Sequence, residues 1–165
     1  RWFRMLSRDD KDKIIEEIYG KKPVGFEIKE FDFDENADIG FGRGDTIRLT
    51  AKSDGKEYYI YPNYEAAKEA AKESMGILFD DIGITAWNED FIESIVPSEI
   101  VDFVRPAYEA VRNNNDYSLS RAGAWEKYLD EIFEESIKAD GLGNTLSAYD
   151  GEEITVNDYY IYRWN

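Results

Sequence analysis

The chain has 165 residues, and neither cysteine nor histidine is among them. Without cysteine there is no disulfide framework, no thiol nucleophile and no zinc or iron–sulfur site built on thiolates. Without histidine there is no imidazole base, no Ser-His-Asp triad and no histidine metal ligand. Any catalysis has to use carboxylates, lysine, arginine, hydroxyl or backbone groups. We therefore expect a protein that is not an enzyme and that holds neither a cofactor nor a metal.

Long hydrophobic runs are also missing. No stretch approaches the roughly 18 uninterrupted apolar residues of a membrane-spanning helix, so we expect no membrane partner. Residues 1–4 (RWFR) lack the apolar run of a signal peptide, and we expect them to be vector-derived or the remnant of a longer start. The chain is nevertheless 42% hydrophobic and 15% aromatic, far from the composition of disordered proteins. We expect residues 1–165 to fold as a single domain.

Acidic residues are plentiful and unevenly distributed. The 36 acids outnumber the 20 bases, which gives a net charge of −16. The segment 73–104 holds eight acids and no base, and the segment 126–158 holds ten acids and two lysines, so each carries −8 and together they carry the whole net charge. Such a field repels nucleic acid and anionic lipid surfaces and attracts a basic protein. We expect no direct contact with nucleic acid.

We predict that acids of these two segments form a partner-binding surface. Three of them, Glu126, Asp130 and Glu134, are spaced four residues apart, which on one helix face separates neighbours by about 6 Å. This is within a few ångströms of the phosphate repeat of DNA, about 3.4 Å per strand, so the spacing favours a DNA mimic. The alternative is a solvated surface that only maintains solubility. The candidate residues are Asp80, Asp81, Glu89, Asp90, Glu93, Glu99, Asp102, Glu126, Asp130, Glu131, Glu134 and Glu135.

Turn residues divide the first third of the chain. Asp54-Gly55 between two alternating runs is the strongest local signal for a β-hairpin, and it favours positive φ at both turn residues. Pro62 ends the second of these strands, and Asn63 is predicted to cap a helix with a buried alanine face. The elements expected before Pro62 are a helix, a strand, a loop and two further strands, at 11–19, 25–33, 34–44, 45–52 and 56–61.

Helical patterns dominate the middle of the chain. After the helix that Asn63 begins, we expect helices at 88–96, from Ser98 to Arg112 and at 121–139; because Pro106 disfavours helical backbone at Arg105, the second either kinks there or gives way to a new helix. The last should be the longest, and Gly141 ends it.

The tail from Leu146 to Trp164 predicts short strands around Asp150-Gly151 and Asn157-Asp158. The run 160–162 (YIY) repeats the run 59–61, and we expect these to be two strands of one antiparallel sheet. The predicted fold class is α+β, an antiparallel sheet of hairpins packed against several helices that cover one of its faces.

Two motifs have weaker metal signatures. Asp32-x-Asp34-x-Asn36-x-Asp38 begins like a calcium loop, but it lacks the glycine and the final glutamate of that loop, so we interpret it as a solvated turn. The run 27–29 (EIK), with Asp12 upstream, is the only arrangement similar to a metal-dependent nuclease core. A second strand carboxylate is missing there.

Several stretches together resemble a loose group of small acidic proteins encoded by tailed bacteriophages. The resemblance covers about half to two-thirds of the chain and implies a phage accessory protein made in a bacterial cytoplasm, where small acidic proteins often act by binding host proteins. It supplies no functional residues. The stretches are 59–61 (YIY), 64–71 (YEAAKEAA), 87–92 (WNEDFI), 139–141 (ADG), 146–151 (LSAYDG) and 160–165 (YIYRWN).

Three functional hypotheses follow. The first is a non-enzymatic phage protein that binds a basic host protein, as a DNA mimic that inhibits restriction or another nucleic-acid-handling defence system. The second is a virion or assembly component whose tyrosine-rich strands, Trp125 and Trp164 make subunit contacts. The third is a carboxylate metal-dependent nuclease.

Overall fold

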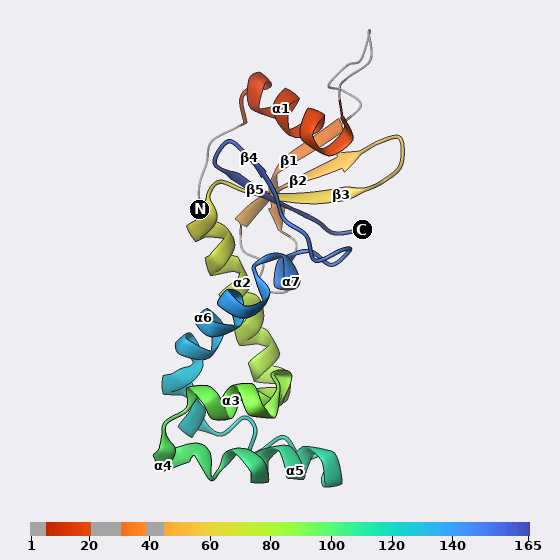
Figure 1. Ribbon diagram of the computed structural model, residues 1–165. Coiled ribbons are helices and arrows are strands. Elements are labelled where there is room, and N and C mark those ends of the chain that lie inside the picture. The colour runs from red at the N-terminus through yellow and green to blue at the C-terminus, as the bar shows by residue number, and fades with distance from the viewer. Residues whose placement is uncertain (1–5, 21–30, 39–44) are drawn as a thin grey trace. The chain divides into compact units, whose positions relative to one another are not determined.

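The computed structural model describes residues 6–20, 31–38 and 45–165 (Figure 1). An antiparallel sheet of five strands and a set of helices make up the described chain, which confirms the α+β prediction. The chain divides into two compact units. The sheet unit comprises Arg1–Ala71 and Leu142–Asn165, and the helical unit comprises Lys72–Gly141. That residues 1–165 form a single domain stays a prediction.

The sheet has the strand order β1-β2-β3-β5-β4, and every neighbouring pair is antiparallel. The tail supplies β4 and β5, and β5 enters the sheet beside β3. The strands are β1 (Phe31–Asp38), β2 (Asp45–Ala51), β3 (Glu57–Tyr61), β4 (Ile154–Val156) and β5 (Tyr159–Arg163). The helices of this unit are α1 (Arg8–Tyr19), the beginning of α2 (Tyr64–Ile82) and α7 (Gly143–Leu146).

The two Tyr-Ile-Tyr runs face each other across β3 and β5, as predicted. Ile60 lies opposite Ile161, and the flanking tyrosines oppose each other in the same register. Because side chains alternate along a strand, the isoleucines share one face of the sheet and the tyrosines share the other. The isoleucine row continues to both sides, since Ile47 of β2 lies opposite Ile60 and Ile154 of β4 lies opposite Ile161.

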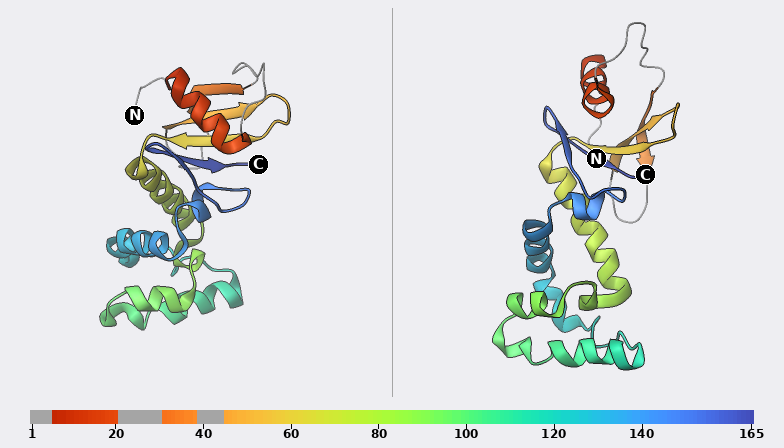
Figure 2. Two further views of the ribbon diagram at one scale, coloured as in Figure 1. Left: turned by 45° about the horizontal axis from the view of Figure 1, so that its top comes forward. Right: turned by 45° about the vertical axis from the view of Figure 1, so that its right-hand side comes forward.

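Helix α1 lies across the isoleucine face (Figure 2). Its Ile14 is fully buried in one cluster with Ile47, Leu49, Ile60 and Ile161. Burying each of these side chains contributes roughly 1.5–3 kcal/mol. Ser7 caps the helix, because its hydroxyl accepts a hydrogen bond from the Asp10 amide at 3.0 Å. Core packing and the cap together fix α1 on the sheet.

The tyrosine face is also buried. The rings of Tyr61 and Tyr162 meet edge to face with centroids 5.9 Å apart. The Tyr162 hydroxyl donates to Glu153 at 2.5 Å. Burial raises the pKa of Tyr162, and the hydrogen bond to Glu153 raises it further. Since this face is buried as well, the sequence-based prediction that one face of the sheet is covered describes half of the packing.

The loop predicted at 34–44 needs correction where the structure describes it. Residues 34–38 belong to β1 and not to a loop, because β1 pairs with β2 and Asp34 forms an ion pair with Arg48 at 3.1 Å. The pairing shifts register between Asp34 and Ala37, which is a β-bulge. The strand predicted at 25–33 lies mostly outside the described residues, and the part that is described, 31–33, is strand.

The β2–β3 hairpin is confirmed, but its turn differs from the predicted one. Gly55 has φ +72° and Asp54 has no positive φ. The amide of Gly55 donates to the carbonyl of Ala51 at 2.8 Å, so four residues form the loop instead of two. The hairpin around Asn157-Asp158 is confirmed, whereas α7 and a turn replace the strand expected before Asp150-Gly151.

The helical unit follows the predicted order of short helices, and the segment from Ser98 to Arg112 forms two helices, with the break before Val104 and not at Arg105. Asn63 caps α2 through the Ala66 amide, Asn88 precedes α3, Ser98 begins α4, and Gly141 follows the last helix, as predicted. The elements are the second part of α2, η2 (Gly83–Ala86), α3 (Glu89–Ile95), α4 (Ser98–Val101), α5 (Val104–Asn114), η3 (Gly123–Tyr128) and α6 (Leu129–Asp140).

The prediction of a longest helix at 121–139 is wrong. The 12-residue α6 begins at Leu129, a 3₁₀ segment precedes it, and α2 is the longer helix with 19 residues. Gly123 is a weak helix former. Trp125 is buried, and its indole N–H donates to the Leu119 carbonyl at 2.7 Å. That contact favours the tighter segment over a continuous α-helix.

A network of hydrogen bonds fixes the turn after α2. The Tyr108 hydroxyl lies 2.6 and 2.7 Å from the carbonyl oxygens of Ile84 and Trp87. The Ser120 hydroxyl donates to the Ile82 carbonyl at 2.7 Å. Burial raises the pKa of Tyr108, with smaller contributions from the charges of Glu89 and Glu93. These two hydroxyl groups form hydrogen bonds with backbone carbonyl groups at the turn, where helical hydrogen bonding is interrupted.

Candidate functional site

All twelve predicted partner-binding carboxylates fall in the helical unit. This unit of 70 residues holds 16 acids and 6 bases, for a charge of −10, and the sheet unit holds 20 acids and 14 bases, for −6. The acidic segment 73–104 lies entirely in the helical unit, whereas the second segment is divided, with 126–140 in the helical unit and 150–158 in the sheet unit. The helical unit is therefore the candidate site.

Among the carboxylates of this unit that have no partner within the described chain, six are predicted site residues that lie between the end of α2 and Asp102. None of them forms an ion pair or a side-chain hydrogen bond with a described residue, and five are exposed while Glu93 is half-buried. They lie at the end of α2, on α3, on α4 and just after α4. We name them the unpaired acids, and they are Asp80, Asp81, Asp90, Glu93, Glu99 and Asp102.

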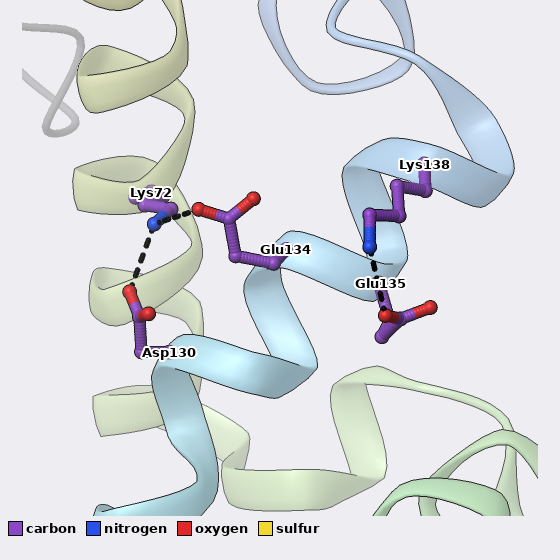
Figure 3. Close-up of polar contacts among 5 residues, drawn as sticks. All are labelled: Lys72, Asp130, Glu134, Glu135 and Lys138. Atoms are coloured by element: carbon purple, nitrogen blue, oxygen red, sulfur yellow. Dashed lines mark hydrogen bonds and ion pairs between the residues drawn. The ribbon is translucent and has the colours of Figure 1, made fainter.

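Lys72 neutralises part of the predicted acidic stripe. Its ammonium group on α2 lies 2.8 Å from Asp130 and 2.5 Å from Glu134 on α6 (Figure 3). Partial burial acts to lower the pKa of Lys72, but the hydrogen bonds and charges of the two carboxylates outweigh it, so the pKa is raised. The sequence contains no local signal for this contact, because Lys72 is far from α6 along the chain.

The stripe of Glu126, Asp130 and Glu134 does not form as predicted. Glu126 belongs to η3, so it does not continue the α6 face that carries the other two. The remaining predicted acids differ in whether they form an ion pair. Glu89 pairs with Arg112 at 3.3 Å, Glu135 pairs with Lys138 at 3.2 Å, and Glu131 is exposed without an ion pair to described residues.

Apolar side chains accompany the acids on this unit. Ile77 is 47% exposed, Leu78 is 42% exposed and Phe103 is 64% exposed. Ile77 falls outside the helical spacing of Met75 and Phe79, which are buried, whereas Leu78 follows Met75 by three residues and fits that spacing, so its exposure has no sequence signal. By contrast, Trp125 and most of the tyrosines invoked for subunit contacts are buried within the chain.

The described residues offer little for catalysis. They contain no group of three acidic side chains that could hold a metal ion. The calcium-like motif lies in β1 and is a strand, not the predicted turn. Ser120 is buried, and its hydroxyl is committed to the Ile82 carbonyl. The nuclease-like residues 27–29 lie outside the described residues.

None of the described helices has the length and apolar character needed to cross a bilayer. Comparisons of the chain with known protein families, with curated proteins and with solved structures found no match. Function therefore has to be inferred from the charge and exposure of the helical unit.

Proposed function

We propose that the protein binds a basic protein through the acidic surface of the helical unit and catalyses no reaction. The observation that carries the proposal is the charge of −10 within 70 residues, together with six acids that are unpaired within the described chain. A carboxylate that is held in an ion pair attracts a basic partner less strongly than an unpaired carboxylate does. The unpaired acids are therefore the main contributors.

Such a surface acts mainly on the association rate. Long-range attraction between opposite charges raises association rates by roughly 10 to 10³, and salt screens it over about 10 Å at 0.1 M. Each exposed carboxylate contributes modestly, as rim charges do. A loss of one acid should therefore matter little, and a loss of all six should matter greatly.

The resemblance to phage proteins points to the kind of partner. It supports a host protein in a bacterial cytoplasm, and a basic protein there is most often one that handles nucleic acid. Competition for a nucleic-acid-binding surface is the DNA-mimic form of the proposal. Asp130 and Glu134 pair with Lys72, so they do not present a regular row of free charges. The DNA-mimic form of the proposal therefore rests on the unpaired acids and not on the predicted stripe.

The test uses two variants with equal charge changes. One replaces the unpaired acids by their amides. The matched control replaces six exposed acids of the sheet unit that form no ion pair with described residues, namely Glu16, Glu17, Glu65, Glu69, Glu152 and Asp158. The parent and both variants are immobilised on a support and incubated with bacterial extract, and the proteins that each retains are identified by mass spectrometry. Their association rates are then measured at two salt concentrations.

The parent and the control should retain the same basic protein. The variant of the unpaired acids should associate with it at least tenfold more slowly at low salt, with a weaker salt dependence. Equal rates for the two variants would show that the helical unit has no special role. Release of the partner by duplex DNA would support the DNA-mimic form, and retention in the presence of DNA would contradict it.

A further inference from the structure

The second half of α2 has two chemically different sides. Met75 and Phe79 are buried, as is expected of the side that packs on the rest of the unit. At 100° per residue, Ile77 lies nearly opposite them, and Glu73 and Asp81 lie one turn before and one turn after Ile77 on that outward side. An aliphatic side chain thus stands between acids on the solvent side of the helix.

This outward side is open. Ile77 and Leu78 are about half exposed, and Glu73, Asp80 and Asp81 are exposed as well. A Cβ atom added at Gly76 would meet no atom of the described residues within 4 Å, so none of these residues covers the helix beside Ile77. Leu78 lies 100° around the helix from Ile77, so the two side chains adjoin along one edge of this face, and contiguous exposed apolar side chains with a rim of acids are typical of an interaction surface.

We propose that the outward face of α2, from Glu73 to Asp81, is the docking surface for a basic amphipathic helix. This inference deepens the proposed function and rests on it, because it names the type of segment that the acidic unit takes. The apolar side of the partner helix covers Ile77 and Leu78, while its lysines and arginines pair with Glu73, Asp80 and Asp81. The charge complementarity selects a basic helix over a second copy of this acidic chain.

The dimensions of the face agree with this partner. Glu73 to Asp81 spans eight residues, or about 12 Å along the helix at 1.5 Å per residue. A partner helix of three to four turns covers such a face with one apolar anchor per turn, which is the usual spacing for helix recognition. Binding should therefore depend on the two aliphatic side chains as well as on charge.

The experiment uses two synthetic peptide probes with the full-length protein. One is an 18-residue amphipathic lysine/leucine helix, and the other is the same peptide with every leucine replaced by serine. Dissociation constants are measured by fluorescence anisotropy at about 0.15 M salt. The test variant is Ile77→Gln with Leu78→Gln, because glutamine is polar and favours helix. The matched control is Phe103→Gln with Leu119→Gln, two exposed apolar residues outside α2.

The parent and the control should bind the lysine/leucine peptide at least tenfold more tightly than the lysine/serine peptide. The test variant should lose that preference and bind both peptides alike. Retention of the preference by the test variant, or its loss in the control, overturns the docking surface. If the parent binds both peptides equally, the acidic surface acts by charge alone and this inference fails. If the parent binds neither peptide, the proposed function fails too.

A second pair of variants keeps the test informative if the glutamine substitutions unfold α2, which circular dichroism reveals. One is Glu73→Gln, Asp80→Asn and Asp81→Asn, and the other is Glu99→Gln, Asp102→Asn and Glu109→Gln. Both remove three exposed charges from the same unit. The first should weaken binding of the lysine/leucine peptide severalfold more than the second. Equal weakening by the two triples contradicts the inference.

Discussion

The amide of Ile84 donates a hydrogen bond to the carbonyl oxygen of Ser120 at 3.0 Å, directly beside Gly83. This contact brings the end of α2 against a segment that lies far along the chain. Gly83 has φ +67°, and a Cβ atom there would overlap the backbone and hydroxyl of Ser120. Only glycine fits at this position, for reasons of conformation and of space together.

Gly83→Ala should therefore lower the free energy of unfolding by more than about 3 kcal/mol. Two other glycines separate the causes. Gly141 has φ +80° and ψ 165° with open space around it, so Gly141→Ala should cost only the backbone strain of about 1–3 kcal/mol. Gly76 is helical with open space, so Gly76→Ala should stabilise by up to about 1 kcal/mol. Urea unfolding measures all three, and any other rank order contradicts the explanation.

Lys72→Met should lower the free energy of unfolding by about 1 kcal/mol, because it removes the charge that holds Asp130 and Glu134 near each other. Lys138→Met is the control. Lys138 pairs with Glu135 within the same helix and is well exposed, so its loss should cost less than about 0.5 kcal/mol. Urea unfolding at low and at high salt tests this, and the difference should shrink at high salt. Equal losses would mean that the contact between α2 and α6 adds nothing.

Stability should decrease at alkaline pH. Burial raises the pKa of Tyr162, and the hydrogen bond to Glu153 and its charge raise it further. An unfolded tyrosine titrates near pH 10, so above that pH the unfolded chain releases a proton that the folded chain retains. The contribution of Tyr162 is therefore complete below about pH 10 and is lost as the pH rises beyond it.

Tyr162→Phe should show a shallower loss of stability between about pH 9.5 and 11.5 than the parent does, measured by urea unfolding at fixed pH. Tyr64→Phe, at an exposed tyrosine, is the control and should follow the parent. Burial raises the pKa of Tyr108 in the same direction, so some loss should remain in the Tyr162 variant. An unchanged slope in that variant would refute the role of Tyr162.

Tyr19→Phe should raise the free energy of unfolding by about 1 kcal/mol. The Tyr19 hydroxyl oxygen is buried and has no hydrogen-bond partner among the described residues. Its ring packs against Phe31 and Tyr58 with centroids 5.0 and 6.1 Å apart, and phenylalanine keeps those contacts. Tyr108→Phe is the opposite case, since its hydroxyl contacts two carbonyls, and it should cost about 1–3 kcal/mol. Thermal unfolding of both variants decides the matter.

Local signals predicted much of the fold. Asn63 and Gly141 mark helix ends because each satisfies backbone groups nearby, and β2 alternates because Ile47 and Leu49 are buried whereas Arg48 between them is only half-buried. The pairing of the two Tyr-Ile-Tyr runs was also predictable from their likeness. Where the prediction failed, distant contacts decided the outcome. The Trp125 indole, bound to the Leu119 carbonyl, accompanies a 3₁₀ segment within the predicted long helix.

The candidate site was predicted less completely. The uneven distribution of acids along the sequence identified twelve candidate binding residues, and the helical unit contains all twelve. Which acids are neutralised could not be predicted, because Lys72 reaches Asp130 and Glu134 through tertiary packing. The exposure of Ile77 has a weak periodic signal and that of Leu78 has none, and an aliphatic residue in a helix predicts burial more often than exposure.

The interruption of the sheet unit by the helical unit sets an order of events during synthesis. Ile60 and Ile161 pair although about 100 residues separate them, so β3 leaves the ribosome long before β5 exists. At a translation rate of 5–20 residues per second, β5 is synthesised on the order of ten seconds after the hairpin of β2 and β3, and until then one edge of that hairpin is unpaired. The helical unit, rich in local contacts, has time to form meanwhile. Throughout that interval the edge of β3 that will pair with β5 is free, and it can pair with other nascent chains made from the same messenger RNA.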